Sequence, residues 1–333
     1  MSTRPFKQVD VFTTTPYRGN PLAVVLDGTG LDDATMQRFA HWTNLSETTF
    51  VLPPTETGRQ GGADYRVRIF TPGGELPFAG HPTLGSCHAW LQAGGQSRVA
   101  QHIVQECQVG LVTIRRQGAQ LAFAAPPLQR SAPSPMLLAK VAAALGLQSQ
   151  HIVAAQVLDN GPVWFSLLLD SVQTVLQLTP KHQELINLGQ KVGVAAVEYA
   201  QEAPVLIARS NREARAFGGS GTAGIGVSAG SGVNHAGEAA SDAACGDADA
   251  TPAHVEVRAF AAPIGVNEDP VTGSLNAALA QWLIADGHAP ARYVASQGAC
   301  LGRDGRVSIE QDAQGQVWVG GESVTCIDGS VTL

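Results

Sequence analysis

The stretch His81-Pro-Thr-Leu-Gly-Ser86 recurs as Asp269-Pro-Val-Thr-Gly-Ser274, 188 residues further along the chain. Each copy follows a strand-like segment that contains Arg-x-Phe, Arg68-Ile-Phe70 in the first and Arg258-Ala-Phe260 in the second. Each copy also begins a helical segment that ends in Trp-Leu. Two halves that share one strand–loop–helix unit predict duplicated domains that face each other.

The composition of the repeated loop indicates how it could bind a ligand. Glycine and small residues allow a tight turn and a close approach, and proline favours the first turn of a helix. A helix N-terminus offers free backbone N–H groups and the positive end of the helix dipole, which suit a carboxylate or an enolate. Two such termini could hold a small anionic substrate between them, although two ordinary helix starts would produce the same pattern.

Around the repeat, short segments with strand periodicity outnumber segments with helical periodicity. We expect strands at 9–12, 22–26, 48–52, 65–70, 98–106, 111–115, 121–124, 151–158 and 163–169, and helices at 32–42, 82–92 and 136–145. The helix at 32–42 has Asp32 or Asp33 available as its N-cap. Consecutive prolines at 126–127 and a Pro/Ser-rich stretch at 131–135 predict a domain boundary near 125–135.

Residues 218–253 differ from the rest of the chain. They contain 9 Gly, 10 Ala and four acidic residues, and no Lys or Arg. A segment without periodicity or aromatic residues cannot bury enough surface to offset the entropy of ordering it. We therefore predict an inserted, mobile surface loop, and we interpret Cys245 within it as incidental because a reactive thiol needs a fixed electropositive surrounding.

Length, charge and cysteine content exclude several classes of protein. The chain has 333 residues, which fits two domains, and its 21 basic and 28 acidic residues give a net charge of −7. This balance argues against nucleic-acid or anionic-membrane partners, and no apolar stretch approaches the roughly 20 residues of a membrane span. Five scattered cysteines argue against a disulfide framework or a zinc site. With no apolar leader-like segment at its start, we expect a cytoplasmic protein without a metal or other cofactor.

Three titratable residues are candidates for chemistry, and each has a plainer alternative. Glu47 lies between a helix and a strand, where it could act as a general base, but the spacing Asn44-x-x-Glu47 also fits a capping box. His81 and Asp269 occupy the same place in the two repeats, directly before proline. A histidine there can titrate near neutral pH, whereas Asp269 could simply be a helix N-cap.

Four segments together resemble a known family. These are Gly19-Asn-Pro21, Leu45-Ser-Glu-Thr-Thr-Phe-Val51, the long stretch from Arg68 to Gly85 and Glu268-Asp-Pro-Val-Thr-Gly-Ser274. They resemble the phenazine-biosynthesis isomerase (PhzF-like) family, which is related to diaminopimelate epimerase and proline racemase. The resemblance covers the whole chain except the 218–253 insertion, and the stretch from Arg68 to Gly85 is highly specific.

The resemblance implies an α+β fold of two similar domains, each a mixed, curled sheet around a central helix, with the active site in the cleft between them. The first domain would comprise residues 1–125 and the second 130–325. The last strand, near 325–333, could return to the first domain. A homodimer is a further expectation from the family.

The resemblance also implies a function. The chain would be a cofactor-independent isomerase that moves a proton between carbons of a small amino- or hydroxy-carboxylate, similar to trans-2,3-dihydro-3-hydroxyanthranilate isomerase. The matching catalytic positions are Glu47 as general acid/base, His81 and Asp269, and the matching substrate-binding positions are Asn20, Ser46, Gly80, Gly273 and Ser274.

Two alternatives remain open at this point. The first is an amino-acid epimerase or racemase. The epimerase relatives use one cysteine from each domain, and no thiol lies in either loop here, so racemisation by two cysteines is disfavoured. The second is a non-catalytic binding protein on the same fold. Neither the substrate nor the pathway is marked by any motif.

Overall fold

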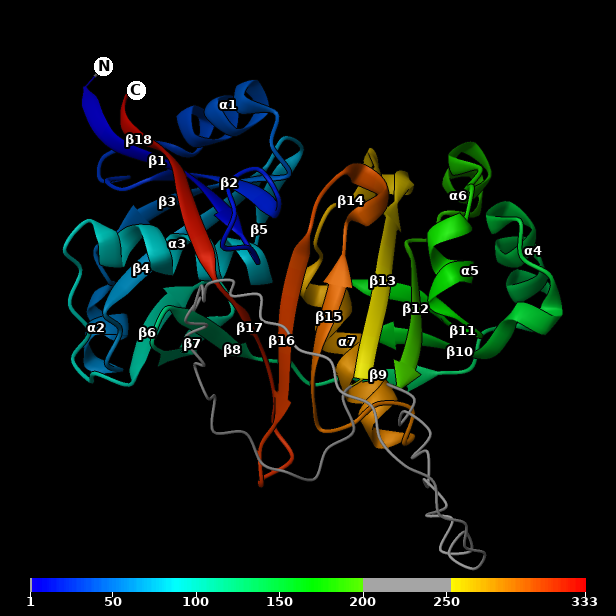
Figure 1. The fold of residues 1–333 in the computed structure, drawn as a ribbon. Helices are drawn as coiled ribbons and strands as arrows, with labels where there is room; N and C mark the ends of the chain where they lie inside the picture. Colours follow the sequence, from blue (N-terminus) through cyan, green and yellow to red (C-terminus); the bar gives the residue numbers. More distant parts are fainter. Residues whose placement is uncertain (1, 200–252) are drawn as a thin grey trace, which may run out of the picture. The chain divides into compact units, whose positions relative to one another are not determined.

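One pattern of strands and helices occurs twice along the chain (Figure 1). The structure is a computed structural model that describes residues 2–199 and 253–333. We call β1–β8 the first half and β10–β17 the second half. The predicted insertion at 218–253 lies outside the described residues, apart from Ala253.

The first half carries strands and helices in the following order: β1 (Thr3–Val11), β2 (Asn20–Val25), α1 (Asp33–Thr43), β3 (Glu47–Leu52), α2 (Glu56–Gln60), β4 (Tyr65–Thr71), β5 (Gly74–Leu76), α3 (Gly80–Gln92), β6 (His102–Cys107), β7 (Gly110–Gln117) and β8 (Gln120–Ala124). The predicted strand at 98–106 is shorter than expected, because only an isolated bridge between Val99 and His102 precedes β6.

The rest of the chain continues with β9 (Gln129–Ser131), α4 (Pro135–Leu145), η1 (Ser149–His151), β10 (Ile152–Asp159), β11 (Val163–Leu169), α5 (Val172–Gln177), α6 (His182–Leu188), β12 (Val192–Tyr199), β13 (Ala253–Ala261), η2 (Ala262–Ile264), β14 (Val266–Asp269), α7 (Gly273–Ala285), β15 (Arg292–Gln297), η3 (Ala299–Leu301), β16 (Gly305–Gln311), β17 (Val317–Gly321) and β18 (Ser323–Thr332).

Strand pairing in the two halves is the same. In the first half, β1–β2 is antiparallel, β2–β3 parallel, β3–β4 antiparallel, β4–β6 parallel, and β6–β7 and β7–β8 antiparallel. In the second half, β10–β11, β11–β12, β12–β13, β13–β15, β15–β16 and β16–β17 repeat this series. The predicted duplication is thus confirmed as a mixed α/β fold with two similar halves.

The strand that follows each half pairs with the other half. β9, which follows β8 in the chain, pairs with β10, while β18 follows β17 and pairs with β1 along its whole length (Figure 1). The pairing of β8 with β17 joins the halves at a further point. The chain ends are therefore part of the sheet. The boundaries of the two predicted domains stay a prediction.

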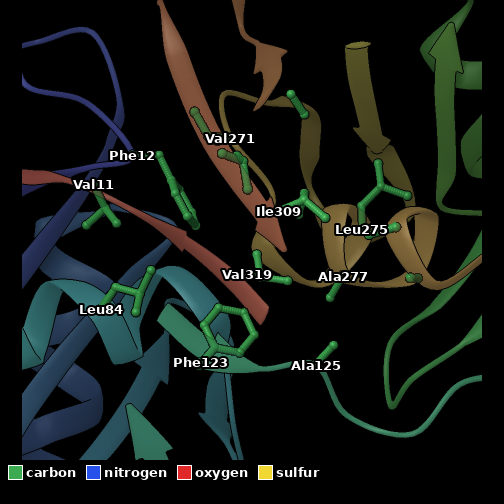
Figure 2. Packing of buried hydrophobic residues seen from close by; sticks show 14 of the residues in the cluster. Val11, Phe12, Leu84, Phe123, Ala125, Val271, Leu275, Ala277, Ile309 and Val319 are labelled. Atoms are coloured by element: carbon green, nitrogen blue, oxygen red, sulfur yellow. The ribbon is translucent and has the colours of Figure 1, made fainter. Parts of the chain in front are cut away.

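A single hydrophobic cluster draws side chains from both halves. Figure 2 shows Leu84 of α3 and Phe123 of β8 in this cluster together with Val271, Leu275 of α7 and Val319 of β17. Each of these five side chains is at most 1% exposed. A fully buried side chain of this size contributes roughly 1.5–3 kcal/mol to folding. The shared core holds the starts of α3 and α7 in fixed positions.

Local sequence signals account for the shorter helices. Asp32 is the N-cap of α1 and its carboxylate accepts from Thr35 N at 2.7 Å, as one of the two predicted caps requires. The apolar side of α1, including Met36 and Phe39, is buried. Ser134 caps α4 in the same way, with Pro135 at the first helical position.

Candidate active site

Glu47 is the first residue of β3 and follows closely on the end of α1. Asn44 ends that helix in the left-handed conformation, with φ of 55°. The capping-box interpretation of Asn44 and Glu47 is therefore wrong, because Asn44 terminates a helix and does not begin one. Parallel pairing with Leu22 of β2 then fixes the backbone of Glu47 at the start of β3.

His81 is the second residue of α3 and faces Glu47. The imidazole Nε2 lies 3.4 Å from Glu47 Oε2, and the two side chains are 7% and 16% exposed. Both atoms are buried, and within the described residues neither has a hydrogen-bond partner. A buried pair of this kind has free bonding capacity for a proton or for a substrate atom.

Burial sets the protonation of this pair. Loss of water, and to a lesser extent the nearby charge of Asp269, raises the pKa of Glu47 to about 8, while a hydrogen bond from Ser46 opposes the rise. Burial also lowers the pKa of His81 to about 3. Near neutral pH the proton therefore belongs on the Glu47 carboxyl, and the His81 imidazole is neutral.

Asp269 ends β14 and approaches Glu47 from the second half. Its Oδ1 accepts from Asn20 Nδ2 at 3.1 Å, and its Oδ2 accepts from Thr272 Oγ1 at 2.5 Å. Burial raises the pKa of Asp269 to about 6, while these two hydrogen bonds oppose the rise. At pH 7 the Asp269 carboxylate is mainly ionised, so one ionised and one protonated carboxyl group lie close together.

The first residues of α3 and α7 meet at this place. A Cβ atom on Gly273 would lie 3.3 Å from Gly80 Cα, and one on Gly80 would lie 2.6 Å from Phe123 Cζ. Neither helix has a side-chain N-cap hydrogen bond. Two uncapped helix N-termini in contact concentrate partial positive charge, which favours an anionic group between them.

Aligning the two copies of the sequence repeat on their prolines does not align the two helices that follow. Both helices have 13 residues and begin at Gly80 and Gly273, an offset of 193 and not 188. His81 therefore corresponds to Ser274, whereas Asp269 lies outside its helix. The expectation that His81 and Asp269 occupy one place is wrong. The reason is that Pro82 is inside the first turn of α3, whereas Pro270 precedes the N-cap, Thr272, by two residues.

Two ion pairs hold the strands before these helices, and their glutamates are also 193 residues apart, whereas their arginines are 190 residues apart. Arg68 forms two hydrogen bonds to Glu75, at 2.7 and 2.6 Å. Arg258 forms two to Glu268, at 2.9 and 2.8 Å. The arginine of each Arg-x-Phe strand thus fixes the short strand that leads to its helix, a function that the sequence motif alone did not reveal.

The remaining predicted substrate-binding residues have partners within the protein. Asn20 Nδ2 donates to Val271 O at 2.8 Å as well as to Asp269, and Ser46 Oγ donates to Asn20 Oδ1 at 3.4 Å. Ser274 Oγ accepts from Trp164 Nε1 at 3.2 Å. Asn20 and Ser46 therefore position Asp269, and the hydroxyl of Ser274 keeps its own proton to donate.

Gln297, on β15, was not indicated by the sequence. Its Oε1 accepts from Thr272 N at 3.0 Å and from Asn276 Nδ2 at 2.9 Å. Its Nε2 donates to Asp269 O and to Thr272 Oγ1, both at 3.0 Å. All four bonding positions of the amide are used to hold the loop before α7. No local signal could have found this residue, because its partners lie more than 20 positions earlier.

Other chemistry suggested by residue type is not supported. Cys87 is buried within α3, where burial raises the pKa of its thiol to about 12, and Cys245 lies outside the described residues. In residues 2–199 and 253–333 no group of three or more His, Cys, Asp or Glu side chains could hold a metal ion. None of the helices in these ranges is long and apolar enough to cross a membrane.

Comparison with known proteins identifies the family. The model of the phenazine biosynthesis-like (PhzC-PhzF) family matches residues 9–218 and 236–329. The chain belongs to this family. It is 33% identical over 343 residues to "Antisense-enhancing sequence 1" of Schizosaccharomyces pombe, covering 99% of each chain. It is 36% identical over 182 residues to trans-2,3-dihydro-3-hydroxyanthranilate isomerase of Pseudomonas aeruginosa, covering 54% of this chain and 62% of that enzyme.

Solved structures show the same fold. A PhzF-family protein of Bacillus anthracis superposes with a TM-score of 0.72 at 20% identity and covers all of both chains. A probable proline racemase of Agrobacterium radiobacter has a TM-score of 0.52 at 14% identity and covers 99% of this chain and 93% of that one. The predicted relation to the epimerase-like fold is confirmed. The protein is a PhzF-family isomerase and takes a small-molecule substrate.

Proposed function

We propose that the protein moves a proton between two carbons of a small amino- or hydroxy-carboxylate, with Glu47 as general acid and base and no cofactor. The observation that carries the proposal is the buried Glu47–His81 pair at the place where two uncapped helices begin. Its facing atoms, Glu47 Oε2 and His81 Nε2, lie 3.4 Å apart, and neither has a hydrogen-bond partner among the described residues. The similarity to trans-2,3-dihydro-3-hydroxyanthranilate isomerase supports this reaction class.

The chemistry requires a strong, fixed base. A C–H bond next to a carboxylate or an unsaturated bond is a weak acid, so its proton leaves only if a base lies beside it and the developing charge is stabilised. A carboxyl group with a pKa of about 8 is a stronger base, once ionised, than an ordinary carboxylate. The N–H groups at the starts of α3 and α7 are suited to bind the substrate carboxylate and to stabilise that charge.

The proton balance needs no further reactant. Ionised Glu47 takes a proton from one carbon as the electrons of that C–H bond form a new double bond. The same carboxyl group then returns the proton to a second carbon, and the old double bond moves. Neutral His81 is placed to accept or donate a hydrogen bond during the transfer, and ionised Asp269 to bind an amino or hydroxyl group of the substrate.

Replacement of Glu47 by glutamine tests the assignment. We expect Glu47→Gln to lose about 10²- to 10⁴-fold in turnover of trans-2,3-dihydro-3-hydroxyanthranilate while it still binds the compound, because only the proton transfer is removed. Product formation would be followed by proton NMR. The exposed Glu184→Gln is the matched control. Near-normal turnover by Glu47→Gln would refute the role of Glu47, and no turnover by the wild type would refute this substrate.

Asp269 gives one specific reason to consider epimerisation as a second candidate. It supplies a second titratable carboxyl group from the opposite half, as two-base chemistry requires, and its charge raises the pKa of Glu47. An epimerase would introduce solvent deuterium at a stereocentre with inversion of configuration. A proton shift by one base would retain part of the substrate hydrogen in the product. NMR of reactions in deuterium oxide separates the two.

A further inference from the structure

Asn160 lies in the turn between β10 and β11 and is only 8% exposed. Its Nδ2 donates to Ser274 O at 2.9 Å. Its Oδ1 is buried and has no hydrogen-bond partner within the described residues. An unsatisfied amide oxygen in such a position is unfavourable unless a ligand or a water molecule supplies the missing donor.

The orientation of this amide is fixed by its neighbours. Ser274 O can only accept, so exchanging the oxygen and nitrogen of Asn160 would place two acceptors together. The turn itself is held by Asp159 Oδ1, which accepts from Gly161 N at 3.0 Å. The free oxygen of Asn160 is therefore a built feature of the site and not an alternative placement of the amide.

The position of Asn160 places this acceptor at the start of α7. Ser274 is the second residue of α7 and directly follows Gly273, whose added Cβ would lie 3.3 Å from His81 N. Asn20, the first residue of β2, is the comparable residue in the first half, and its Nδ2 donates to Val271 O, just before α7. The side-chain oxygens of Asn20 and Asn160 differ, however, in whether they accept a hydrogen bond.

The oxygen of Asn20 accepts a hydrogen bond from Ser46, whereas that of Asn160 has no donor among the described residues. Three buried polar atoms without partners are therefore associated with the starts of α3 and α7. They are Glu47 Oε2, His81 Nε2 and Asn160 Oδ1. The first two are assigned to proton transfer in the proposed function, which leaves the third available for recognition.

We propose that Asn160 Oδ1 accepts a hydrogen bond from the amino or hydroxyl group of the substrate. This inference rests on the proposed function and names the residue that recognises the amino or hydroxyl group of its substrate. A site built around a buried acceptor rejects an analogue that lacks the donor, because the acceptor then stays unpaired. Asn160 is thus a specificity-determining residue for the reaction, contributed by the second half.

The test compares four stable carboxylates by isothermal titration calorimetry. Benzoate lacks a second polar group, anthranilate adds an amino group, 3-hydroxybenzoate adds a hydroxyl group, and 3-hydroxyanthranilate carries both. We expect the wild type to bind at least one donor-bearing acid about 10- to 100-fold more tightly than benzoate. In Asn160→Ala this preference should fall several-fold, and any preference that remains is due to Asp269, the other group proposed to bind an amino or hydroxyl group.

Trp164→Phe is the matched control, because it removes the other side-chain contact to Ser274 and leaves the Asn160 oxygen in place. It should keep the preference for donor-bearing acids. If Asn160→Ala does not fold, NMR of the wild type tests the same contact. The resonances of the Asn160 side-chain amide should shift when the preferred donor-bearing acid is added and stay unchanged when benzoate is added.

Each outcome bears on a different statement. Equal binding of all four acids, or an undiminished preference in Asn160→Ala, would overturn the role of Asn160 and leave the proposed function intact. Failure of the wild type to bind any of the four would overturn the substrate class, and with it both proposals. Both proposals would be supported if Glu47→Gln loses turnover but keeps the preference for donor-bearing acids, and Asn160→Ala loses most of that preference.

Discussion

The protonated state of Glu47 can be tested without any substrate. The perturbation is Glu47→Gln, which keeps the size and polarity of the side chain and removes its titration. In the folded protein the pKa of Glu47 is raised from its ordinary value of 4.5 to about 8, with burial as the main cause. Stability should therefore depend on pH differently in the two proteins.

The sign follows from proton binding. Between pH 4.5 and pH 8 the unfolded chain loses the Glu47 proton while the folded protein keeps it, so rising pH favours unfolding. The stability that this proton contributes is complete below pH 4.5 and is lost as pH rises through about 8. One pH unit in this interval corresponds to about 1.4 kcal/mol. From pH 5 to pH 7 the wild type should thus lose up to about 3 kcal/mol relative to Glu47→Gln.

Urea denaturation at several pH values measures this difference. The free energy of unfolding of the wild type would be subtracted from that of Glu47→Gln at pH 5, 6, 7 and 8. His81 and Asp269 are present in both proteins, so their contributions largely cancel. Glu184→Gln, which changes an exposed glutamate paired with Lys181 at 3.2 Å, is the control and should give a flat difference.

A flat difference for Glu47→Gln from pH 5 to pH 8 would refute the raised pKa of Glu47. It would mean that Glu47 is ionised in the folded protein at pH 5, as an exposed carboxylate is. A difference of opposite sign would mean that hydrogen bonds or nearby positive charge stabilise the ionised carboxylate. Either result would remove the basis for a strong base in this site.

Three further predictions concern the site and its support. For a substrate that the enzyme turns over, kcat/KM should rise with pH up to about 8, because Glu47 must lose its proton before it can act as a base. A kcat/KM that is independent of pH between 6 and 9 would contradict this. Gly80→Ala should lower the free energy of unfolding by about 1–3 kcal/mol in urea, since its Cβ would lie 2.6 Å from Phe123, whereas Gly74→Ala in open space should change little; equal effects would argue against close packing. Gln297→Ala should cost about 1–3 kcal/mol by the same measurement, because it leaves a buried backbone N–H without an acceptor, whereas Gln183→Ala, at an exposed glutamine of α6, should change little.

Much of the fold could be predicted because its signals are local. The cap at Asp32, the start of α3 and the repeated Arg-x-Phe strands are all readable over a few residues. The motifs around Glu47 and His81 indicated the family, and the match to the family model confirmed it. The alignment of His81 with Asp269 failed because proline is tolerated both within the first turn of a helix and before it.

The contacts around the site could not be predicted, because they join residues far apart in the chain. Asn20 bonds to Asp269, Gln297 to Thr272, and Asn160 to Ser274. None of these pairs has a characteristic spacing or residue pattern. The Asp-Asn-Gly sequence at 159–161 indicates a turn, but nothing in it indicates that the amide oxygen of Asn160 is buried and unpaired.

The amino-acid sequence identifies which chemical groups are available: one glutamate, one histidine and one aspartate near two helix starts, with no thiol in either loop. The protonation states of these groups depend on the folded structure. Burial, and not residue type, keeps the proton on Glu47 and leaves His81 neutral. The physical reason is that a pKa depends on lost water and on neighbouring charges, and folding brings both from distant parts of the chain.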